Sequence, residues 1–328
     1  MADAATTGGR ARLGIVAIGR NEGERLARCL RSIPAGVPVV YVDSASTDGS
    51  ITLAQAAGAI VLPLDLALPF TAARARAEGV ALLRARVPDL DLVMFVDGDC
   101  ELEAGWLATA AAWLTDHPDM AAVCGRRRER FPEASLYNHV ADWEWNTPVG
   151  EATSCGGDAL MRLTAYAAVG GFDPTMIAGE EPELCSRLRT AGWRIMRLDV
   201  PMTIHDASML RFAQWWRRAI RGGFGYAQAW RVTRRRGGSG LYGADLRRML
   251  VWAVGVPLGC VALGALVHPA LVLLWPALIA VQLLRWRARV GVGHAALAAV
   301  GHFAVLAGAL RYAWRSARGG AGGTLVYK

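Results

Sequence analysis

Lysine is almost absent from this chain, because Lys328 is the only one among 36 basic residues. The six cysteines show no paired short spacing, which argues against a zinc site or a disulfide framework and favours reduced thiols. The first ten residues contain no apolar run, so the sequence predicts no signal peptide. There is also no G-x-G-x-x-G motif and no lysine-containing, glycine-rich phosphate loop near the N-terminus.

The charges that are present divide the chain into two parts. Residues 1–202 carry 19 arginines and 26 acidic residues, whereas residues 203–328 carry 17 basic residues and only Asp206 and Asp245. Abundant alanine, glycine and arginine are typical of a GC-rich bacterial genome, so the basic total does not indicate nucleic-acid binding. An acidic half followed by a basic, apolar half indicates a soluble domain that faces a charged surface such as anionic lipid.

Short apolar runs alternate with amphipathic segments through the first 200 residues. Strands are expected at 13–18, 37–42, 59–62, 92–96, 121–125 and 194–198, and helices at 22–33, 50–57, 71–86 and 181–191. This alternation predicts an α/β fold with a doubly wound, mostly parallel sheet. In such sheets ligands bind at the carboxyl ends of the strands.

The last third of the chain has a different pattern. An arginine- and tryptophan-rich amphipathic helix is expected at 212–235, followed by a linker at 234–240. Two uncharged runs, 250–267 and 270–284, predict a transmembrane hairpin, although a buried helical core is the alternative for any one run. A third apolar segment at 295–310 either spans the membrane or lies in its interface.

These patterns predict four regions and a location. The regions are a disordered N-terminus at 1–11, a catalytic domain at 12–205, interface helices and a linker at 206–248, and a membrane domain at 249–328. Within the last region the hairpin covers about 250–284 and the third segment about 295–312. Arg285, Arg287 and Arg289 follow the hairpin, so the positive-inside rule places this loop and the catalytic domain in the cytoplasm, at the inner membrane of a bacterium.

Acidic residues follow two of the expected strands. Asp97 and Asp99 come after an apolar run, and paired carboxylates there suit a divalent cation, Mg²⁺ or Mn²⁺, unless they only cap a turn. Asp43 follows another strand, where it can accept hydrogen bonds from a base or a ribose. Asn21 and Glu22 stand at the first strand–helix junction and reach the same crevice.

Four stretches together carry a resemblance to a known family. They are IVAIGRNEGERLARCLRSI from residue 15, VYVDSASTDGS from residue 40, FVDGDC from residue 95 and GGFDPTMIAGEEPELCSRL from residue 170. Their order and separation, over about residues 12–220, resemble a family 2 inverting glycosyltransferase with a GT-A fold, of the membrane-bound bacterial type. The resemblance implies a nucleotide-sugar donor, a divalent metal and a glycan or lipid-linked acceptor.

The resemblance also implies roles for residues at matching positions. It implies that Asp43, Ala17 and Asn21 contact the base, Asp97 the ribose, Asp99 the metal, and that Glu180 and Glu181 form the acidic pair with Glu181 as general base. The alternative for the pair is that these acids only favour the positive end of a helix.

Further matches are partial. Arg76 matches an Arg-Asn-x-Gly stretch of the family, but the expected Asn is Ala77. Asp158 resembles a residue near the transferred sugar or occupies a turn, and His205 matches a histidine on the metal or diphosphate. Gln214, Trp215 and Arg217 resemble the Q-x-x-R-W motif of polysaccharide synthases, with Arg218 in place of its tryptophan, so processivity is not supported. An interfacial helix explains these last residues equally well.

The expected function is therefore transfer of a sugar from a nucleotide-diphosphate donor at the cytoplasmic membrane face. A nucleotidyltransferase is one alternative, although the missing phosphate loop argues against it. A non-catalytic membrane scaffold with the same fold is the other, and the intact Asp97, Asp99 and Glu181 argue against that. The sugar, the choice between UDP and GDP, and protein partners cannot be read from the sequence.

Overall fold

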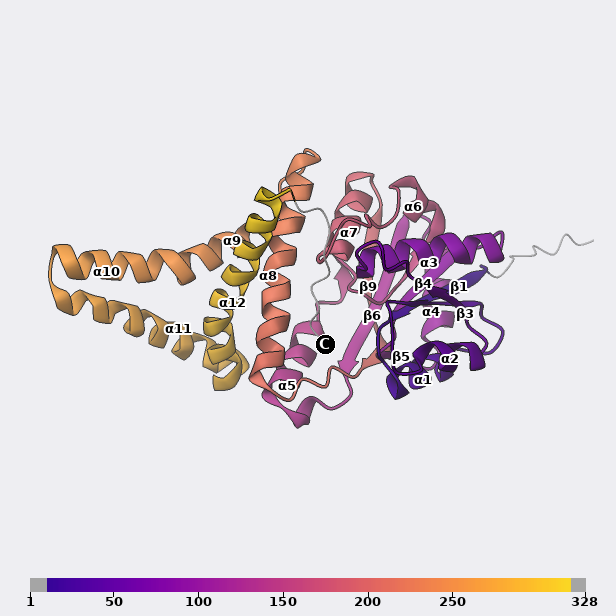
Figure 1. Cartoon of the computed structure of the whole chain (residues 1–328), viewed down its shortest axis with the longest axis horizontal. Coiled ribbons are helices and arrows are strands. Elements are labelled where there is room, and N and C mark those ends of the chain that lie inside the picture. Colours follow the sequence, from indigo (N-terminus) through magenta and orange to yellow (C-terminus); the bar gives the residue numbers. More distant parts are fainter. Residues whose placement is uncertain (1–10, 320–328) are drawn as a thin grey trace, which may run out of the picture.

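The computed structural model describes residues 11–319, except for the side chains of residues 288 and 289. The predicted disordered segment at 1–11 lies outside the described residues apart from Ala11. Within the described range one mixed sheet forms the body of the protein (Figure 1). Its strands are β1 (Leu13–Gly19), β2 (Val39–Asp43), β3 (Ile60–Pro63), β4 (Leu92–Asp97), β5 (Cys100–Leu102), β6 (Met120–Glu129), β7 (Gly150–Glu151), β8 (Ala159–Arg162) and β9 (Arg194–His205).

The sheet confirms the predicted α/β class and places the strands in the order β3-β2-β1-β4-β8-β6-β9-β5. Strands β3, β2, β1 and β4 are parallel, as is the β6–β9 pair. The antiparallel pairings of β8, β5 and β7 were not expected from the sequence. These three strands are only two to four residues long, so they carry too few side chains to show a period.

Helices cover the sheet and then continue into a separate helical part (Figure 1). In the first part they are α1 (Glu24–Arg31), α2 (Ser50–Ala56), α3 (Ala72–Arg86), α4 (Trp106–Asp116), η1 (Pro132–Ala134), α5 (Leu136–Trp145), α6 (Leu163–Ala168) and α7 (Glu180–Thr190). In the second they are α8 (Phe212–Arg235), α9 (Gly243–Leu250), η2 (Val251–Gly255), α10 (Val256–Leu266), η3 (Pro269–Leu273), α11 (Leu274–Val290) and α12 (Val292–Ala317).

The core lies between the sheet and its helices. Strands β1 and β4 are buried along almost their whole length, as expected for strands covered on both faces. Gly79 of α3 permits the closest approach, because a Cβ at this position would lie 2.5 Å from a methyl carbon of Val16 and 2.9 Å from one of Val42. The α3 backbone therefore rests directly on β1 and β2, and this contact sets the position of Arg76 one turn earlier.

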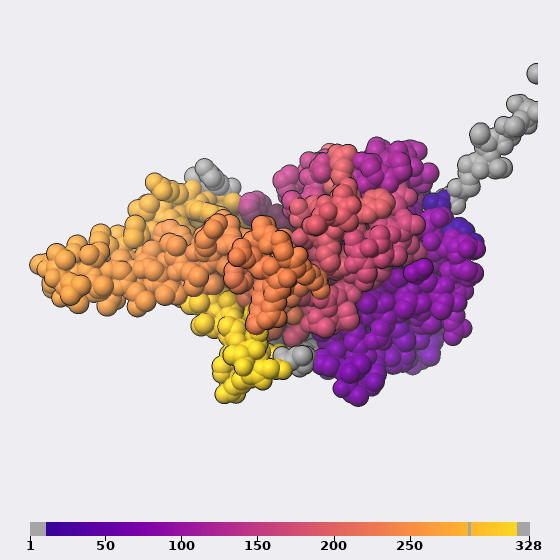
Figure 2. Space-filling model, turned by 90° about the horizontal axis from the view of Figure 1, so that it is seen from above, coloured from indigo at the N-terminus to yellow at the C-terminus, as the bar shows by residue number. Residues whose placement is uncertain are grey.

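Helices α8 and α12 approach each other closely at two glycines, Gly223 and Gly308. A Cβ at Gly308 would lie 2.0 Å from the Ile220 carbonyl oxygen, and one at Gly223 would lie 2.1 Å from that of Val305. The backbones therefore touch in the way small residues allow between membrane helices. The α10–α11 hairpin projects away from this pair and from the sheet domain (Figures 1 and 2).

Three helices of the described chain are long and apolar enough to cross a membrane. They comprise residues Gly243–Leu266, Pro269–Arg287 and Val292–Ala317. The predicted hairpin turn at His268 and Pro269 is present, because η3 begins at Pro269. The predicted linker at 234–240 is shifted by two residues, because α8 continues to Arg235 and α9 begins at Gly243.

Candidate active site

The polar residues predicted to share one edge of the sheet do meet there. Gly19 of β1 pairs with Asp43 of β2, and Ile18 pairs with Asp97 of β4. In the turn after β4, Gly98 donates its N–H to the Ile18 carbonyl at 2.8 Å. A Cβ at Gly98 would lie 3.1 Å from that same oxygen, so a glycine lets the two strand ends approach and directs Asp99 out of the sheet.

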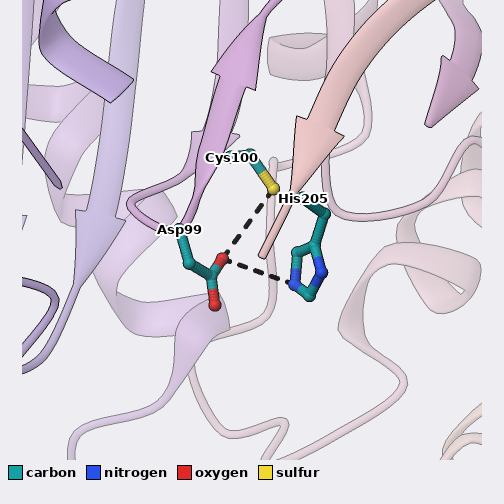
Figure 3. Close-up of side chains that lie close together, drawn as sticks. All are labelled: Asp99, Cys100 and His205. Atoms are coloured by element: carbon teal, nitrogen blue, oxygen red, sulfur yellow. Dashed lines mark hydrogen bonds and ion pairs between the residues drawn. The ribbon is translucent and has the colours of Figure 1, made fainter. Parts of the chain in front are cut away.

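Asp99 and His205 face each other across this edge (Figure 3). His205 Nε2 lies 3.6 Å from Asp99 Oδ1, and its Nδ1 lies 3.2 Å from Glu129 Oε2. Glu129 is 5% exposed and ends β6, so its carboxylate holds the imidazole from behind. With the proton on Nδ1, the Nε2 lone pair points toward Asp99.

This pair fits a divalent cation. A carboxylate oxygen and an imidazole nitrogen suit Mn²⁺, and Mg²⁺ accepts the same oxygen with phosphate and water completing its shell. Cys100 Sγ also lies near, 3.8 Å from Asp99 Oδ1, but burial raises the pKa of this thiol well above its usual range and keeps it protonated. Glu129 contacts the other nitrogen of this imidazole, as carboxylates often do next to a metal-binding histidine. Glu129 was not predicted as a site residue, since nothing in the charged run R-R-R-E distinguishes it from an ordinary surface glutamate.

Arg76 is the centre of a second polar group. Its guanidinium contacts Asp97 at 2.7 Å and Glu180 at 2.8 Å, and it is 2% exposed. Burial opposes the charge, but Asp97 and Glu180 outweigh it and raise the pKa of Arg76. Arg127 lies 3.6 Å from Asp97 and 3.6 Å from Asp158. Gly157 leaves room for this pair, because a Cβ there would lie 3.0 Å from the side-chain ends of both Arg76 and Asp97.

Two residues predicted to contact the substrate are in the interior instead. Asp158 has a fully buried side chain, which accepts hydrogen bonds from the Asp97 N–H at 3.0 Å and the Thr203 hydroxyl at 2.9 Å. It therefore ties its loop to β4 and β9, and its contact with sugar hydroxyls stays a prediction. Ala17 is fully buried in the hydrophobic core and offers no surface to a base.

The acidic pair at the start of α7 is split between two environments. Glu180 faces Arg76, whereas Glu181 enters a buried pocket of thiols. Glu181 Oε1 accepts hydrogen bonds from the Cys155 N–H at 2.6 Å, the Cys155 thiol at 3.2 Å and the Cys185 thiol at 2.9 Å. Burial raises the pKa of Glu181, and these donors only partly offset it. The three contacts all fall on one oxygen, so the carboxylate orientation is set by the thiols.

The predicted base-binding end is held by hydrogen bonds between the first two strand ends. Asn21 accepts the Thr47 N–H at 2.7 Å, and Ser46 accepts the Asn21 N–H at 2.8 Å. Asp43 is 1% exposed and accepts from the Ser46 N–H at 2.8 Å and the Tyr41 hydroxyl at 3.1 Å. These contacts fix the loop.

Glu22 lies beside this loop and is 7% exposed. Its carboxylate pairs at 2.8 Å with Arg25, which lies three residues later in α1. Its Cγ would lie 3.3 Å from a Cβ at Gly98, so Glu22 borders the turn that carries Asp97 and Asp99.

The three residues that resemble the polysaccharide-synthase motif lie in three different environments. Gln214 accepts hydrogen bonds from the Leu210 and Arg211 N–H groups at 2.9 Å each, so it caps the start of α8. Trp215 is buried against α5 and α12. Arg217 is exposed, and it is Arg218 that lines the adjoining cavity, because one residue turns a helix by about 100°. Neither Gln214 nor Arg217 lines that cavity, and their substrate contacts stay predictions.

A cavity of about 740 Å³ connects the site with the helical part. Gly179 and Glu180 line it from the catalytic side, and Trp215 lines it from α8. Gln282 of α11 and His302 of α12 line the far side, with their side-chain nitrogens 3.4 Å apart. Glu180 of the acidic pair and the apolar helices thus line the same cavity.

Comparisons with known proteins agree with this geometry. The family model described as glycosyl transferase family 2 matches residues 15–173. An uncharacterized glycosyltransferase of Mycobacterium bovis is 30% identical over 195 residues, covering 55% of this chain and 80% of that protein. The pre-mycofactocin glycosyltransferase of Mycobacterium tuberculosis is 26% identical over 258 residues, covering 74% of this chain and 53% of that protein.

Among solved structures, the fold is similar to that of a mannosyltransferase from Pyrobaculum calidifontis in complex with GDP-Man and Mn²⁺. The TM-score is 0.56 at 19% identity, and the match covers 94% of this chain and 88% of that one. At this identity the likeness shows a shared GT-A fold. Together with the sequence relatives, it establishes that the chain is a glycosyltransferase and belongs to family 2.

Proposed function

We propose that the chain is an inverting transferase that moves a sugar from a nucleotide-diphosphate donor to a lipid-linked acceptor at the cytoplasmic face of a bacterial inner membrane. The cavity shared by Glu180 and the apolar helices carries this proposal, because it gives an acceptor from the membrane a route to the acidic pair. The mannosyltransferase of similar fold, which holds GDP-Man and Mn²⁺, supports the donor class.

The donor diphosphate lies between Asp99 and Arg76 in this proposal. Asp99 and His205 would hold a divalent cation, which would supply positive charge to neutralise the departing diphosphate. Arg76 and Arg127 pair with the surrounding carboxylates, and these ion pairs hold the loop after β4 in place. Asp43 and Asn21 shape the end of the site where the base is expected.

The acceptor hydroxyl oxygen attacks the anomeric carbon while the bond from that carbon to the diphosphate oxygen breaks. Glu181 takes the hydroxyl proton as general base, and Glu180, paired with Arg76, positions the site. One displacement inverts the anomeric configuration. The raised pKa of Glu181 makes it a stronger base than an exposed glutamate.

The experiment is a donor screen with purified protein in detergent and membrane-lipid extract, reading nucleotide release and product configuration. We expect free nucleoside diphosphate and an inverted product from one UDP- or GDP-sugar. Pyrophosphate release would instead indicate a nucleotidyltransferase, and no release with any donor would indicate a scaffold. Transfer to a soluble glycan but not to lipid would overturn the acceptor assignment.

The direction of the helices supports a proposal for how the helical part meets the membrane. The hairpin of α10 and α11 points away from the sheet domain, whereas α12 runs beside α8 (Figure 1). If the hairpin crosses the bilayer, α12 lies along its surface with α8. An Arg287→Cys variant should therefore resist a membrane-impermeant thiol reagent from the periplasm, and labelling there would contradict the arrangement.

A further inference from the structure

A groove of about 960 Å³ lies among α8, α9 and α12, separate from the metal and acidic residues. All of its lining residues fall between Ala227 and Ala317, so no strand and no residue of the candidate active site contributes to it. The turn between α8 and α9 forms one wall. Gly240 in this turn has φ +87°, and a Cβ there would lie 2.7 Å from the Trp230 ring, so the wall is closely packed.

The charged residues of the groove are all positive. Arg231, Arg234 and Arg247 line it, and no carboxylate does. Their neighbours are neutral: Arg231 donates to the Ser316 hydroxyl, and Arg234 lies 5.9 Å from the Trp230 ring centroid. No ion pair involves these three arginines within residues 11–319. Three cations around one space favour the binding of an anion from outside the chain.

Most of the other residues that line the groove are apolar. Leu246, Leu250, Leu306 and Leu310 line it, and Leu250 and Leu310 are 50% and 59% exposed. Trp230, 40% exposed, adds an aromatic ring of the kind found at membrane interfaces. A free phosphate or a nucleotide would use the arginines but would leave these leucines exposed to water.

The groove also lies where a membrane segment begins. The apolar segment Gly243–Leu266 starts at its edge, and α8 and α12 are the helices that lie along the membrane surface in the arrangement above. The arginines are thus at the level of lipid headgroups, where each basic residue contributes about 1 kcal/mol with anionic lipid.

We propose that this groove binds one anionic phospholipid, with its phosphate at Arg231, Arg234 and Arg247 and its acyl chains along Leu250 and Leu310. The binding site is distinct from both donor and acceptor sites. Met249 of α9 lines this groove and also the 740 Å³ cavity, so the bound lipid holds α9 in the position that forms the acceptor cavity.

The test is native mass spectrometry of the full chain in detergent, titrated with phosphatidylglycerol or phosphatidylcholine. One phosphatidylglycerol should be retained, in preference to phosphatidylcholine. Arg231→Gln and Arg247→Gln should each weaken retention about fivefold. Arg235→Gln is the charge-matched control, because this exposed arginine near the end of α8 does not line the groove, and it should bind like the wild type.

Ala313→Trp fills the groove without changing any charge and should also abolish retention. Retention that is equal for both lipids, or equally weakened by Arg235→Gln, would overturn the proposal. Displacement by millimolar inorganic phosphate would show a phosphate site and would overturn it as well. Because binding is read without any sugar donor, failure here is distinguishable from failure of the proposed transferase activity.

Discussion

Arginine has opposite surroundings in the two parts of this molecule. In the sheet domain, Arg76 and Arg127 are enclosed by Asp97, Asp158 and Glu180, and the nearby acids raise the pKa of both guanidinium groups. In the helical part, the groove arginines have neutral neighbours. In our proposals, the same side chain organises a substrate site where acids surround it and binds an external anion where acids are absent.

The strongest expected effect is in the sheet domain, at the metal. Asp99→Asn removes the charged ligand that faces His205, and a bound cation supplies several kcal/mol of transition-state stabilisation. We expect nucleotide release to fall by about a thousandfold or more. Chelator should silence the wild type until Mn²⁺ or Mg²⁺ returns, and Asp116→Asn at an exposed position should behave like the wild type. Full activity in chelator would contradict the metal role.

The acidic pair should show the next largest effect. Glu181→Gln keeps the shape of the side chain but cannot accept a proton, so kcat should fall by about 10²–10⁴-fold with little change in donor affinity. Glu180→Gln should be milder, because Glu180 contacts Arg76 and orients the site. If the rate falls only in the Glu180 variant, the roles are reversed. If neither variant is slower, the two acids only stabilise the start of α7. Loss of a negative charge there costs about 0.3–1 kcal/mol of stability.

A change in the helical part should separate the two regions. Gly308→Val places a side chain against the Ile220 carbonyl, and such overpacking costs about 1–3 kcal/mol or more. We expect transfer to lipid to fall while slow hydrolysis of the donor persists, because the metal site is unchanged. Gly259→Val, where a Cβ meets no atom within 4 Å, is the matched control. Equal loss of hydrolysis and transfer would show that the two regions are not separable.

The smallest expected effect is a shift in pH dependence. Burial raises the pKa of Glu181, so protonation begins to remove the base at a higher pH than for an exposed glutamate, and kcat falls as pH falls through that value. Cys185→Ala removes a thiol hydrogen bond that lowers this pKa, so the acid limb should move to higher pH. Cys185→Ser should restore most of the original profile. A profile unchanged by Cys185→Ala would remove Glu181 from the proton transfer.

The sequence by itself determined much of the architecture. Hydrophobic period and turn residues located β1, β2, β4, α3 and α8 within about two residues, because these signals are local. The uncharged runs located three helices of membrane-spanning length. The Asp-Gly-Asp turn and the acidic pair identified the site edge, since strand ends in a parallel sheet meet there.

Tertiary structure alone decided which way each side chain faces. Glu129 and His205 are 76 residues apart along the chain and meet only because β6 and β9 pair. Asp158 is buried because β8 runs antiparallel between β4 and β6, and Arg218 replaces Arg217 at the cavity because of the rotation of α8 against α12. Periodicity reports local conformation, whereas these contacts depend on register and packing between distant segments, which no single stretch of sequence encodes.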